Sequence, residues 1–354
     1  MKTPKILFIL KRREDYDPEK HTVNGLSTGL FNSASFMADM LINSGIEAVL
    51  EIAIDNNCID RLVTKHRPTH VIIEALWVVP TKFTVLTKLH PSVNWIIRIH
   101  SELPFLAGEG MAINWLGDYS QFPKVFVGVN APRVLDEIQT YLQIKNQWTT
   151  EQTGKKVFYL PNYYPQAYVS KEYKINSEYI NIGCYGAVRP LKNHLPQAIA
   201  AIKFADYIGK KLNFHINGGR IEMKGDPVMQ NLRSLFMQLH DTGHRLISDD
   251  WVPRDEFLSV CGKLDIGLQV SFSETFNIVG ADIISQGVPL VGSIEIPWMD
   301  EKYTARAQYG EEIYNCLLIT HQDPQKNVKR NQRLLTEYTN QTNEIWIRQF
   351  TKEF

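Results

Sequence analysis

Two carboxylates, Glu274 and Asp282, stand on either side of a short apolar run in residues 271–293. The run has the length of a helix and stops at Gly287 and Pro289, after which an apolar stretch predicts a buried strand. Glu274 is therefore expected in the loop before this helix, and Asp282 two turns inside it on roughly the same side. Backbone N–H groups at a helix start attract phosphate, and acids nearby suit hydroxyl groups. A nucleotide joined to a sugar carries both groups, whereas an ordinary loop, helix and strand is the alternative interpretation.

A pair of cations follows an apolar run further upstream, where Gly183 and Gly186 precede Arg189 and Lys192. The pattern predicts a strand, a turn and then a helix starting near residue 193, so both cations are expected at a strand end beside a helix N-terminus. Two cations and a positive helix end suit a diphosphate that gains negative charge as a sugar leaves. The alternative is a pair of ordinary surface charges.

Short apolar runs alternate with helix-like stretches along the whole chain, and this predicts parallel sheets covered by helices on both faces. The first series of runs is 6–10, 48–54, 70–75, 95–99 and 124–129, and the second is 179–185, 212–217, 246–248, 264–270 and 288–291. Prolines and tyrosines interrupt the pattern between residues 160 and 177. The sequence therefore predicts an α/β fold with two Rossmann-like domains and a cleft between them, 1–165 and 166–325, followed by a helical tail, 326–354.

The composition fits a folded enzyme. The chain has 354 residues, of which 44% are hydrophobic and 21% charged, enough for two domains of common size. Lys plus Arg equals Asp plus Glu, at 38 each, which excludes a global basic field but not local basic patches. The four cysteines lie far apart without a C-x-x-C pair, so reduced cytosolic thiols are expected rather than zinc or disulfides. The sequence predicts no membrane span, and residues 1–10 predict a buried strand rather than a signal peptide.

Ligands of open parallel sheets bind beyond the carboxyl ends of the strands, so the loops there give further candidates. The basic segment Lys11, Arg12 and Arg13 follows the first strand, and Gly25 and Gly29 precede the first helix. The two glycines allow backbone to approach a phosphate or a sugar, or form a simple turn, and their spacing does not fit a nicotinamide site. Three polar or aromatic groups follow later strands, namely His100, Asn217 with Arg220, and Trp251 with Val252. For His100 a structural hydrogen bond and a functional role are both open, and for Trp251 packing is the alternative.

Residues 271–293 resemble the donor-site signature of glycosyltransferases with the GT-B fold, in the large retaining family that includes glycogen-synthase-like and sucrose-synthase-like enzymes. Glu274, Phe276, Gly287 and Pro289 match the signature in register, whereas the second acid is Asp282 instead of Glu and is one methylene shorter. The resemblance implies two Rossmann-like domains with parallel sheets facing each other across a cleft. It also implies a nucleoside-diphosphate sugar, with UDP as the expected nucleotide, as donor substrate, and transfer with retention, without a tightly bound cofactor or a metal.

The resemblance further implies roles for single residues. Glu274 and His100 are expected to orient the sugar, while Arg189 and Lys192 stabilise the diphosphate, and these four form the catalytic set. Trp251 and Val252 are expected to cover the nucleotide base. The other predicted donor-binding residues are Gly25, Gly29, Asn217, Thr275, Phe276, Asn277 and Asp282.

Several segments, including Lys11–Arg13 and residues 189–194, look like a group of glycosyltransferases from tailed-phage genomes, over nearly the whole chain. Such phages often glycosylate hydroxymethylated pyrimidines in their own DNA. The leading acceptor is therefore 5-hydroxymethylcytosine in double-stranded DNA, flipped into the cleft, with Lys11, Arg12 and Arg13 at the phosphates and the host cytoplasm as location. A solvated loop is the alternative for this basic segment. A glycan, lipid or small-molecule acceptor remains open, and so does a non-catalytic nucleotide-sugar-binding protein.

Overall fold

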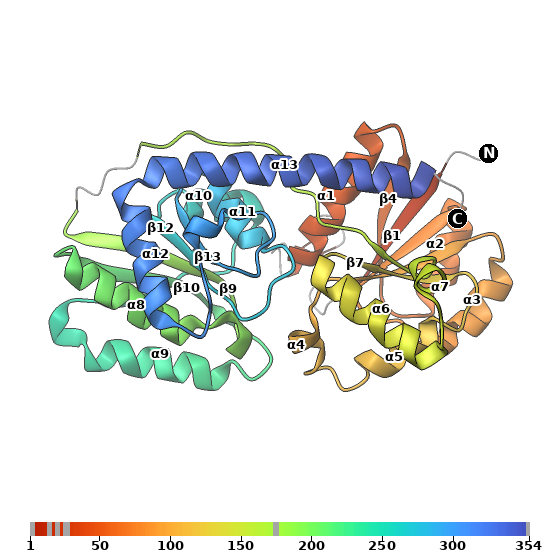
Figure 1. Ribbon diagram of the computed structural model, residues 1–354, viewed down its shortest axis with the longest axis horizontal. Helices are drawn as coiled ribbons and strands as arrows, with labels where there is room; N and C mark the ends of the chain where they lie inside the picture. The colour runs from red at the N-terminus through yellow and green to blue at the C-terminus, as the bar shows by residue number, and fades with distance from the viewer. Residues whose placement is uncertain (1–3, 13–15, 18–21, 24–28, 173–176, 352–354) are drawn as a thin grey trace. The chain divides into compact units, whose positions relative to one another are not determined.

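The computed structural model describes residues 4–12, 16–17, 22–23, 29–172 and 177–351. The chain divides into two compact units (Figure 1): unit 1 contains residues 1–165 and 339–354, and unit 2 contains residues 166–338.

Unit 1 is built on a six-stranded parallel sheet in the order β4-β1-β5-β6-β7-β8. Its strands are β1 (Lys5–Lys11), β4 (Glu47–Ala53), β5 (His70–Glu74), β6 (Asn94–Ile99), β7 (Val125–Val129) and β8 (Val157–Tyr159). Successive side chains of β1 enter two different cores, because Ile6 and Phe8 pack with one cluster while Leu7 and Ile9 pack with another. Both faces of the sheet are therefore buried, which explains why these strands are continuous apolar runs.

The helices of unit 1 connect successive strands. They are α1 (Gly29–Asn43), α2 (Cys58–His66), α3 (Phe83–Leu89), α4 (Leu103–Leu106), α5 (Ala112–Tyr119), α6 (Pro132–Asn146) and α7 (Thr150–Gly154), with the 3₁₀ turn η1 (Pro80–Lys82) before α3. Two short strands, β2 (Tyr16–Asp17) and β3 (Thr22–Val23), form a separate antiparallel pair.

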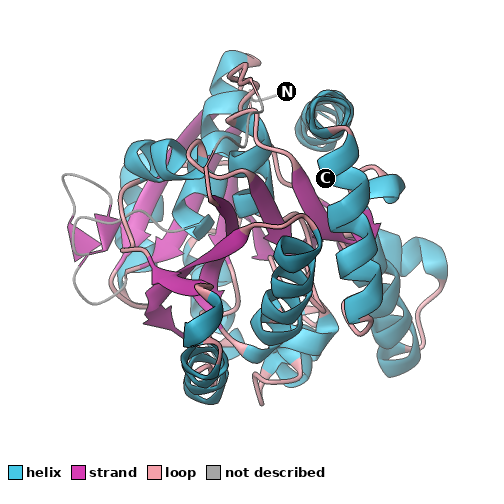
Figure 2. Ribbon diagram, turned by 90° about the vertical axis from the view of Figure 1, so that its left-hand side faces the viewer, coloured by secondary structure: helices cyan, strands magenta, loops and turns pink. Residues whose placement is uncertain are grey.

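Unit 2 repeats this architecture with the strand order β11-β10-β9-β12-β13-β14. Its strands are β9 (Tyr179–Val188), β10 (Lys211–Ile221), β11 (Arg245–Ser248), β12 (Ile266–Gln269), β13 (Leu290–Ser293) and β14 (Thr304–Ala305). Its helices are α8 (His194–Tyr207), α9 (Asp226–Gln238), α10 (Arg254–Cys261), α11 (Ile278–Ser285) and α12 (Gly310–Gln322), with the 3₁₀ turns η2 (Pro190–Lys192), η3 (His240–Thr242) and η4 (Glu301–Tyr303). Figure 2 shows strands lying between layers of helices.

The last helix, α13 (Pro324–Thr351), begins in unit 2 and ends in unit 1. It is the long blue helix at the top of Figure 1. Near its end, Trp346 stacks on Phe8 with ring centroids 6.0 Å apart, and its indole N–H donates to the Pro161 carbonyl at 2.9 Å. Phe350 meets the His70 ring edge-on at 5.1 Å. The end of α13 is therefore part of the unit 1 core.

The predicted α/β class with two parallel sheets is confirmed. The sequence did not indicate the short strands β8 and β14, and it ended β9 and β10 too early. β10 continues to Ile221 because irregularities in its pairing with β9, between His215 and Asn217 and between Asn217 and Ile221, let the two strands meet again at Val188. None of the helices in the described part of the chain has the length and apolar character needed to cross a membrane.

Candidate functional site

The sheet of unit 2 changes direction at β9. From β9 the chain adds β10 and β11 on one side, and then returns to add β12, β13 and β14 on the other. In parallel sheets the crevice beyond the carboxyl ends of the strands at such a switch point is the usual ligand site. Arg189 and Lys192 follow β9, while Glu274 follows its neighbour β12. The three residues predicted to act on the donor therefore come from the two strands that flank the switch point.

The structure brings Lys192 and Glu274 into direct contact. The Lys192 ammonium donates to the Glu274 carboxylate, and the two side chains keep only 11% and 9% of their exposure. The backbone explains this approach, because the Phe272 N–H donates to the Leu191 carbonyl at 2.9 Å and ties the loop after β12 to the turn after β9. The site therefore holds a cation and an acid together in a nearly buried position.

The turn that presents the cations depends on two residues with positive φ. Gly186, with φ 111°, receives the Asn217 side chain, whose Oδ1 accepts from the Gly186 N–H at 2.9 Å. Asn193, with φ 58°, closes the 3₁₀ turn η2 and is followed by α8. Glycine adopts such a conformation without a steric penalty, and asparagine is among the few other residues that tolerate it. Asn217, predicted to bind the donor, thus stabilises the turn that carries Arg189 and Lys192.

Arg189 is connected to the loop after β11 through two further charged residues. Its guanidinium lies 3.8 Å from the Glu222 carboxylate, which accepts from Arg220 Nη2 at 2.6 Å. The Arg220 guanidinium in turn lies over the Trp251 ring, 4.3 Å from its centroid. Arg189, the phosphate-binding candidate, is therefore connected through Glu222 and Arg220 to Trp251, the base-covering candidate. The sequence analysis missed Glu222, because only the extended end of β10 brings it to this position.

Residues 275–277 are buried and support the start of α11. Asn277 has φ 60° and caps the helix, since its Oδ1 accepts from the Gly280 N–H at 2.7 Å. Phe276 packs against Trp298 and Tyr338, with ring centroids 6.1 and 5.6 Å away. These contacts hold Glu274 just ahead of a capped helix N-terminus, as the sequence predicts. For Phe276 and Asn277 the structure shows packing and capping, and their predicted contacts with the donor remain predictions, as does that of the buried Thr275.

Asp282 occupies a different place from the one expected. The helix begins only at Ile278, after the left-handed Asn277, so Asp282 is one turn inside it rather than two. Its carboxylate is buried and accepts from Arg254 Nη2 at 2.8 Å. Arg254 begins α10, directly after the Trp251–Pro253 segment. The structure thus gives Asp282 a charged partner within unit 2, and its predicted reach to the nucleotide ribose stays a prediction, as does the role of Val252.

The glycine of the signature has a packing reason. Gly287 has φ 71°, and a Cβ atom there would lie 2.7 Å from the Val169 carbonyl oxygen. The same segment is bonded to the end of α11, because the Val169 N–H donates to the Ser285 carbonyl at 2.7 Å. Any side chain at 287 would push the incoming segment away from α11.

The electrostatics of the switch point favour an anion. His194, the first residue of α8, is buried, and among the described residues neither of its ring nitrogens has a hydrogen-bond partner. Burial lowers its pKa to about 3, and the nearby Lys192 and Arg189 act in the same direction. The cations that disfavour a protonated His194 attract a phosphate placed at the same helix start. Within the described residues, no group of three His, Cys, Asp or Glu side chains is arranged to hold a metal ion.

The candidates of unit 1 follow its own strands. Lys11 and Arg12 are exposed at the end of β1, and Gly29 is the first residue of α1. Arg13 and Gly25 lie outside the described residues. His100 follows β6, keeps 14% of its side chain exposed, and directs Nε2 to the carboxylate of the fully buried Glu74. The sequence analysis missed Glu74, although a single acid closing an otherwise apolar strand was a usable signal.

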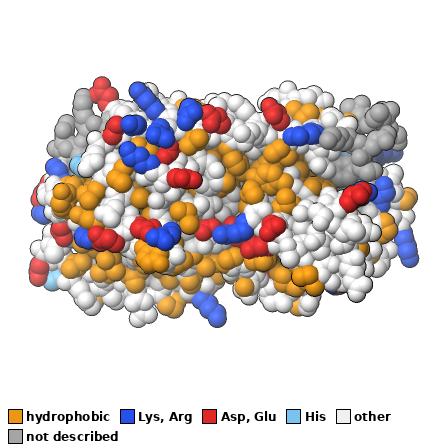
Figure 3. All heavy atoms as spheres, viewed as in Figure 1, with side chains coloured by type: hydrophobic (Ala, Val, Ile, Leu, Met, Phe, Trp, Pro, Cys, Tyr) orange, Lys and Arg blue, Asp and Glu red, His pale blue; other side chains and the backbone are white. Residues whose placement is uncertain are grey.

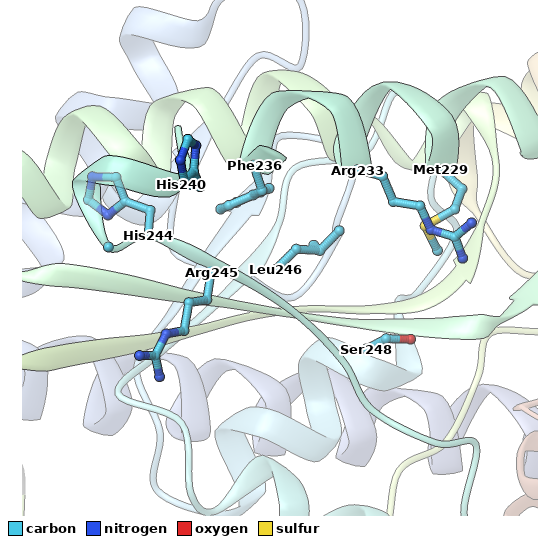
Figure 4. A pocket seen from close by; sticks show the side chains of 9 residues that line it. Met229, Arg233, Phe236, His240, His244, Arg245, Leu246 and Ser248 are labelled. Atoms are coloured by element: carbon cyan, nitrogen blue, oxygen red, sulfur yellow. The ribbon is translucent and has the colours of Figure 1, made fainter. Parts of the chain in front are cut away.

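A cavity of about 540 Å³ lies elsewhere in unit 2, between α9 and the edge strand β11 (Figure 4). Two of its basic residues already have partners: His244 contacts Asp206 at 3.0 Å, and the Arg245 guanidinium covers the Tyr179 ring at 4.6 Å. None of the predicted site residues is among those that line it. The switch point therefore remains the candidate site.

Comparisons with known proteins identify the fold. A scan against protein-family models and a search of curated proteins find no match. Among solved structures, the α,α-trehalose-phosphate synthase (UDP-forming) from Burkholderia vietnamiensis is 10% identical with a TM-score of 0.67, and the match covers 99% of this chain and 97% of that one. The sucrose-phosphate synthase from Thermosynechococcus elongatus is 11% identical with a TM-score of 0.66, covering 98% and 99%.

A third similar structure is a variant of TarM from S. aureus in complex with UDP, which is 12% identical with a TM-score of 0.59. That match covers 80% of this chain but 55% of the TarM chain, so the chain spans about half the length of that protein. At these identities the likeness establishes the architecture. The chain has the two-sheet α/β architecture of GT-B glycosyltransferases.

Proposed function

We propose that this protein transfers a sugar from a UDP-sugar to an acceptor hydroxyl, with retention at the anomeric carbon. The observation that carries the proposal is the Lys192–Glu274 contact at the switch point of unit 2, with Arg189 and the start of α8 beside it. A sugar diphosphate needs cations at the phosphates and an acceptor of hydroxyl hydrogen bonds close by, and these residues supply both.

In the proposed reaction, the bond between the anomeric carbon and the phosphate oxygen breaks, and its electron pair stays on the phosphate. The acceptor oxygen forms the new bond on the same face of the sugar, and its proton is released with the nucleoside diphosphate. Arg189, Lys192 and the N-terminus of α8 stabilise the charge that grows on the diphosphate. Glu274 and His100 orient the sugar hydroxyls.

UDP is the proposed nucleotide because one of the similar structures is a complex with UDP and another is a UDP-forming synthase. The Arg220–Trp251 stack is connected to Arg189 through Glu222, and the nucleotide base is proposed to pack against this stack. Aromatic faces stack readily on nucleotide bases.

The test is turnover of UDP-sugars, followed by release of UDP in water and with candidate acceptors. We expect Arg189→Ala and Glu274→Ala each to reduce turnover by on the order of a hundredfold or more, because a preorganised charge at the reacting centre is lost. The matched controls are Arg306→Ala and Glu312→Ala, which break an ion pair elsewhere in unit 2. Full activity in either site variant rejects the assignment, and UDP binding without any turnover favours a non-catalytic nucleotide-sugar-binding protein.

For the acceptor, we propose a hydroxymethylated pyrimidine in double-stranded DNA. Support comes from the likeness to tailed-phage glycosyltransferases and from the exposed Lys11 and Arg12 at the end of β1. The net charge is zero, and Figure 3 shows acidic and basic side chains interspersed on the face that it presents. DNA binding would therefore depend on this local cluster.

The acceptor proposal predicts DNA binding that weakens with salt and weakens further when Lys11, Arg12 and Arg13 are replaced by alanine. Transfer to hydroxymethylated DNA, compared with unmodified DNA of the same sequence, measures the specificity. Binding that is indifferent to these replacements favours a glycan, a lipid or a small molecule as acceptor.

A further inference from the structure

The charged groups at the carboxyl end of the unit 1 sheet form a closed network. Glu74 ends β5, and its register partner on the neighbouring strand β6 is Arg98. Both side chains are fully buried, and Arg98 Nη1 lies 3.2 and 3.4 Å from the two carboxylate oxygens. His100, two residues further along the chain, directs Nε2 to the same carboxylate. The Glu74 carboxylate therefore contacts both a permanent cation, Arg98, and the ring of His100.

Arg98 is fixed from the opposite side by backbone. Its Nε donates to the Leu160 carbonyl and Nη2 to the Pro161 carbonyl, each at 3.2 Å, and Nη2 also donates to Asn162 Oδ1. The Trp346 ring covers the guanidinium, 5.1 Å from its centroid. With its donors engaged on both sides, Arg98 has no room to leave Glu74, so the carboxylate that faces His100 is held in place.

This arrangement fixes the proton on the His100 ring. An ionised carboxylate only accepts hydrogen bonds, so a neutral imidazole that contacts it through Nε2 must carry its proton there. Burial raises the pKa of Glu74, but Arg98 and His100 outweigh it and hold this pKa below its usual value. Burial lowers the pKa of His100, and Arg98 adds to this against the opposing effect of Glu74. The pair is thus an ionised Glu74 and a neutral His100 with Nδ1 as the accepting nitrogen.

We propose that Glu74, held by Arg98, is a positioning residue that keeps His100 in the neutral Nε2–H tautomer. This inference rests on the proposed role of His100 in sugar transfer.

The first test measures the tautomer directly and needs no activity. In protein labelled with ¹⁵N in the histidine rings, the His100 signals, assigned with His100→Asn, are expected to report Nε2–H near neutral pH. Glu74→Gln removes this preference, because an amide can either donate to or accept from the ring. The matched control is Glu51→Gln, since Glu51 contacts His66 Nε2 at 2.5 Å within the same unit. An unchanged His100 tautomer in Glu74→Gln overturns the inference.

The second test is the pH profile of UDP-sugar turnover. We expect Glu74→Gln to lower kcat on the order of tenfold to a hundredfold, as loss of an orienting partner does. It should also move the acid limb of the profile to lower pH, because the group that raises the pKa of His100 is gone. A loss of kcat that is the same at every pH, with no shift of the acid limb, indicates a purely structural role for Glu74 and overturns the inference.

A further variant covers the case in which Arg98, left without its acid, prevents folding. Glu74→Gln combined with Arg98→Met removes both buried charges, and we expect it to fold with the tautomer preference lost. Retention of Nε2–H in this double variant overturns the inference. If the wild-type protein neither turns over nor binds UDP-sugars, the proposed function fails, while the ring tautomer still decides whether Glu74 positions His100.

Discussion

At the carboxyl end of the unit 1 sheet, Glu74 and Arg98 pair with both side chains fully buried, whereas at the same end of the unit 2 sheet Lys192 and Glu274 keep 11% and 9% exposure. Arg189 and Glu222 in unit 2 are more open still, at 23% and 26%. A fully buried pair cannot exchange partners without exposing a bare charge to a nonpolar interior. A pair that keeps some exposure to solvent can release its cation to an incoming phosphate. We infer that unit 1 uses charge to fix geometry and that unit 2 keeps charge available for a ligand.

The largest effect is expected from breaking the buried pair. Arg98→Met leaves Glu74 buried without its cation and frees two backbone carbonyls, so the free energy of unfolding should fall by about 3–5 kcal/mol. Urea denaturation of the intact chain measures it. The control is Arg306→Met, whose pair with Glu312 is half exposed and should cost about 1 kcal/mol or less. Equal losses in the two variants would mean that burial does not distinguish the pairs.

The sequence alone was sufficient to bring the main candidate residues together, because a simple rule connects strand ends. Arg189, Lys192 and Glu274 each follow an apolar strand, and neighbouring parallel strands bring their carboxyl ends together. The apolar runs marked most of these strands, since both faces of each sheet are buried. The contact between Lys192 and Glu274 needed only that two such strands be neighbours, which they are.

The remaining residues depended on contacts that no local pattern contains. Asp282 pairs with Arg254, 28 residues earlier in the chain, and the left-handed Asn277 delays the helix start by an amount that spacing does not reveal. Glu222 reaches Arg189 only because the pairing of β10 with β9 is irregular. The proposed role of Glu74 depends on its register pairing with Arg98 on the neighbouring strand. Each case is a long-range pairing, and one sequence does not specify register or irregularities of pairing.

A smaller effect on stability is expected from the Lys192–Glu274 pair of unit 2, and it should be accompanied by an effect on ligand binding. Lys192→Met removes a cation from the proposed diphosphate site, so UDP affinity measured by titration calorimetry should fall about tenfold or more. The free energy of unfolding should also fall, by about 1–3 kcal/mol, because the nearly buried Glu274 carboxylate loses its cation. Lys203→Met, which breaks the exposed pair between Lys203 of α8 and Glu311 of α12, is the control. Unchanged UDP affinity would place the diphosphate elsewhere.

The buried histidine beside these cations predicts a dependence of stability on pH. The pKa of His194 is lowered to about 3 in the folded protein from its ordinary value near 6.5, so between these values the unfolded chain binds a proton that the folded one does not. Stability should therefore fall as the pH drops below about 6.5, by up to about 1.4 kcal/mol per pH unit. His194→Gln should flatten this slope relative to the wild type in urea denaturation between neutral pH and pH of about 5. An identical slope in the variant would show that His194 is not the titrating group.

The smallest effect should come from Glu222, and its sign is informative. Its carboxylate lies 3.8 Å from the Arg189 guanidinium, where it competes with a diphosphate for the same cation. Glu222→Gln removes the competing charge, so UDP should bind tighter by about 1.4- to fivefold, which corresponds to the 0.2–1 kcal/mol typical of exposed pairs.

Glu312→Gln, an acid paired with Arg306 in the same unit, is the control and should leave UDP affinity unchanged. Weaker UDP binding in Glu222→Gln would mean that this acid instead holds Arg220 over Trp251 for the ligand, since Arg220 Nε also donates to it at 2.7 Å. Tighter UDP binding therefore indicates that the phosphate displaces the Glu222 carboxylate. Weaker UDP binding indicates that Glu222 holds Arg220 against Trp251 beside the nucleotide base.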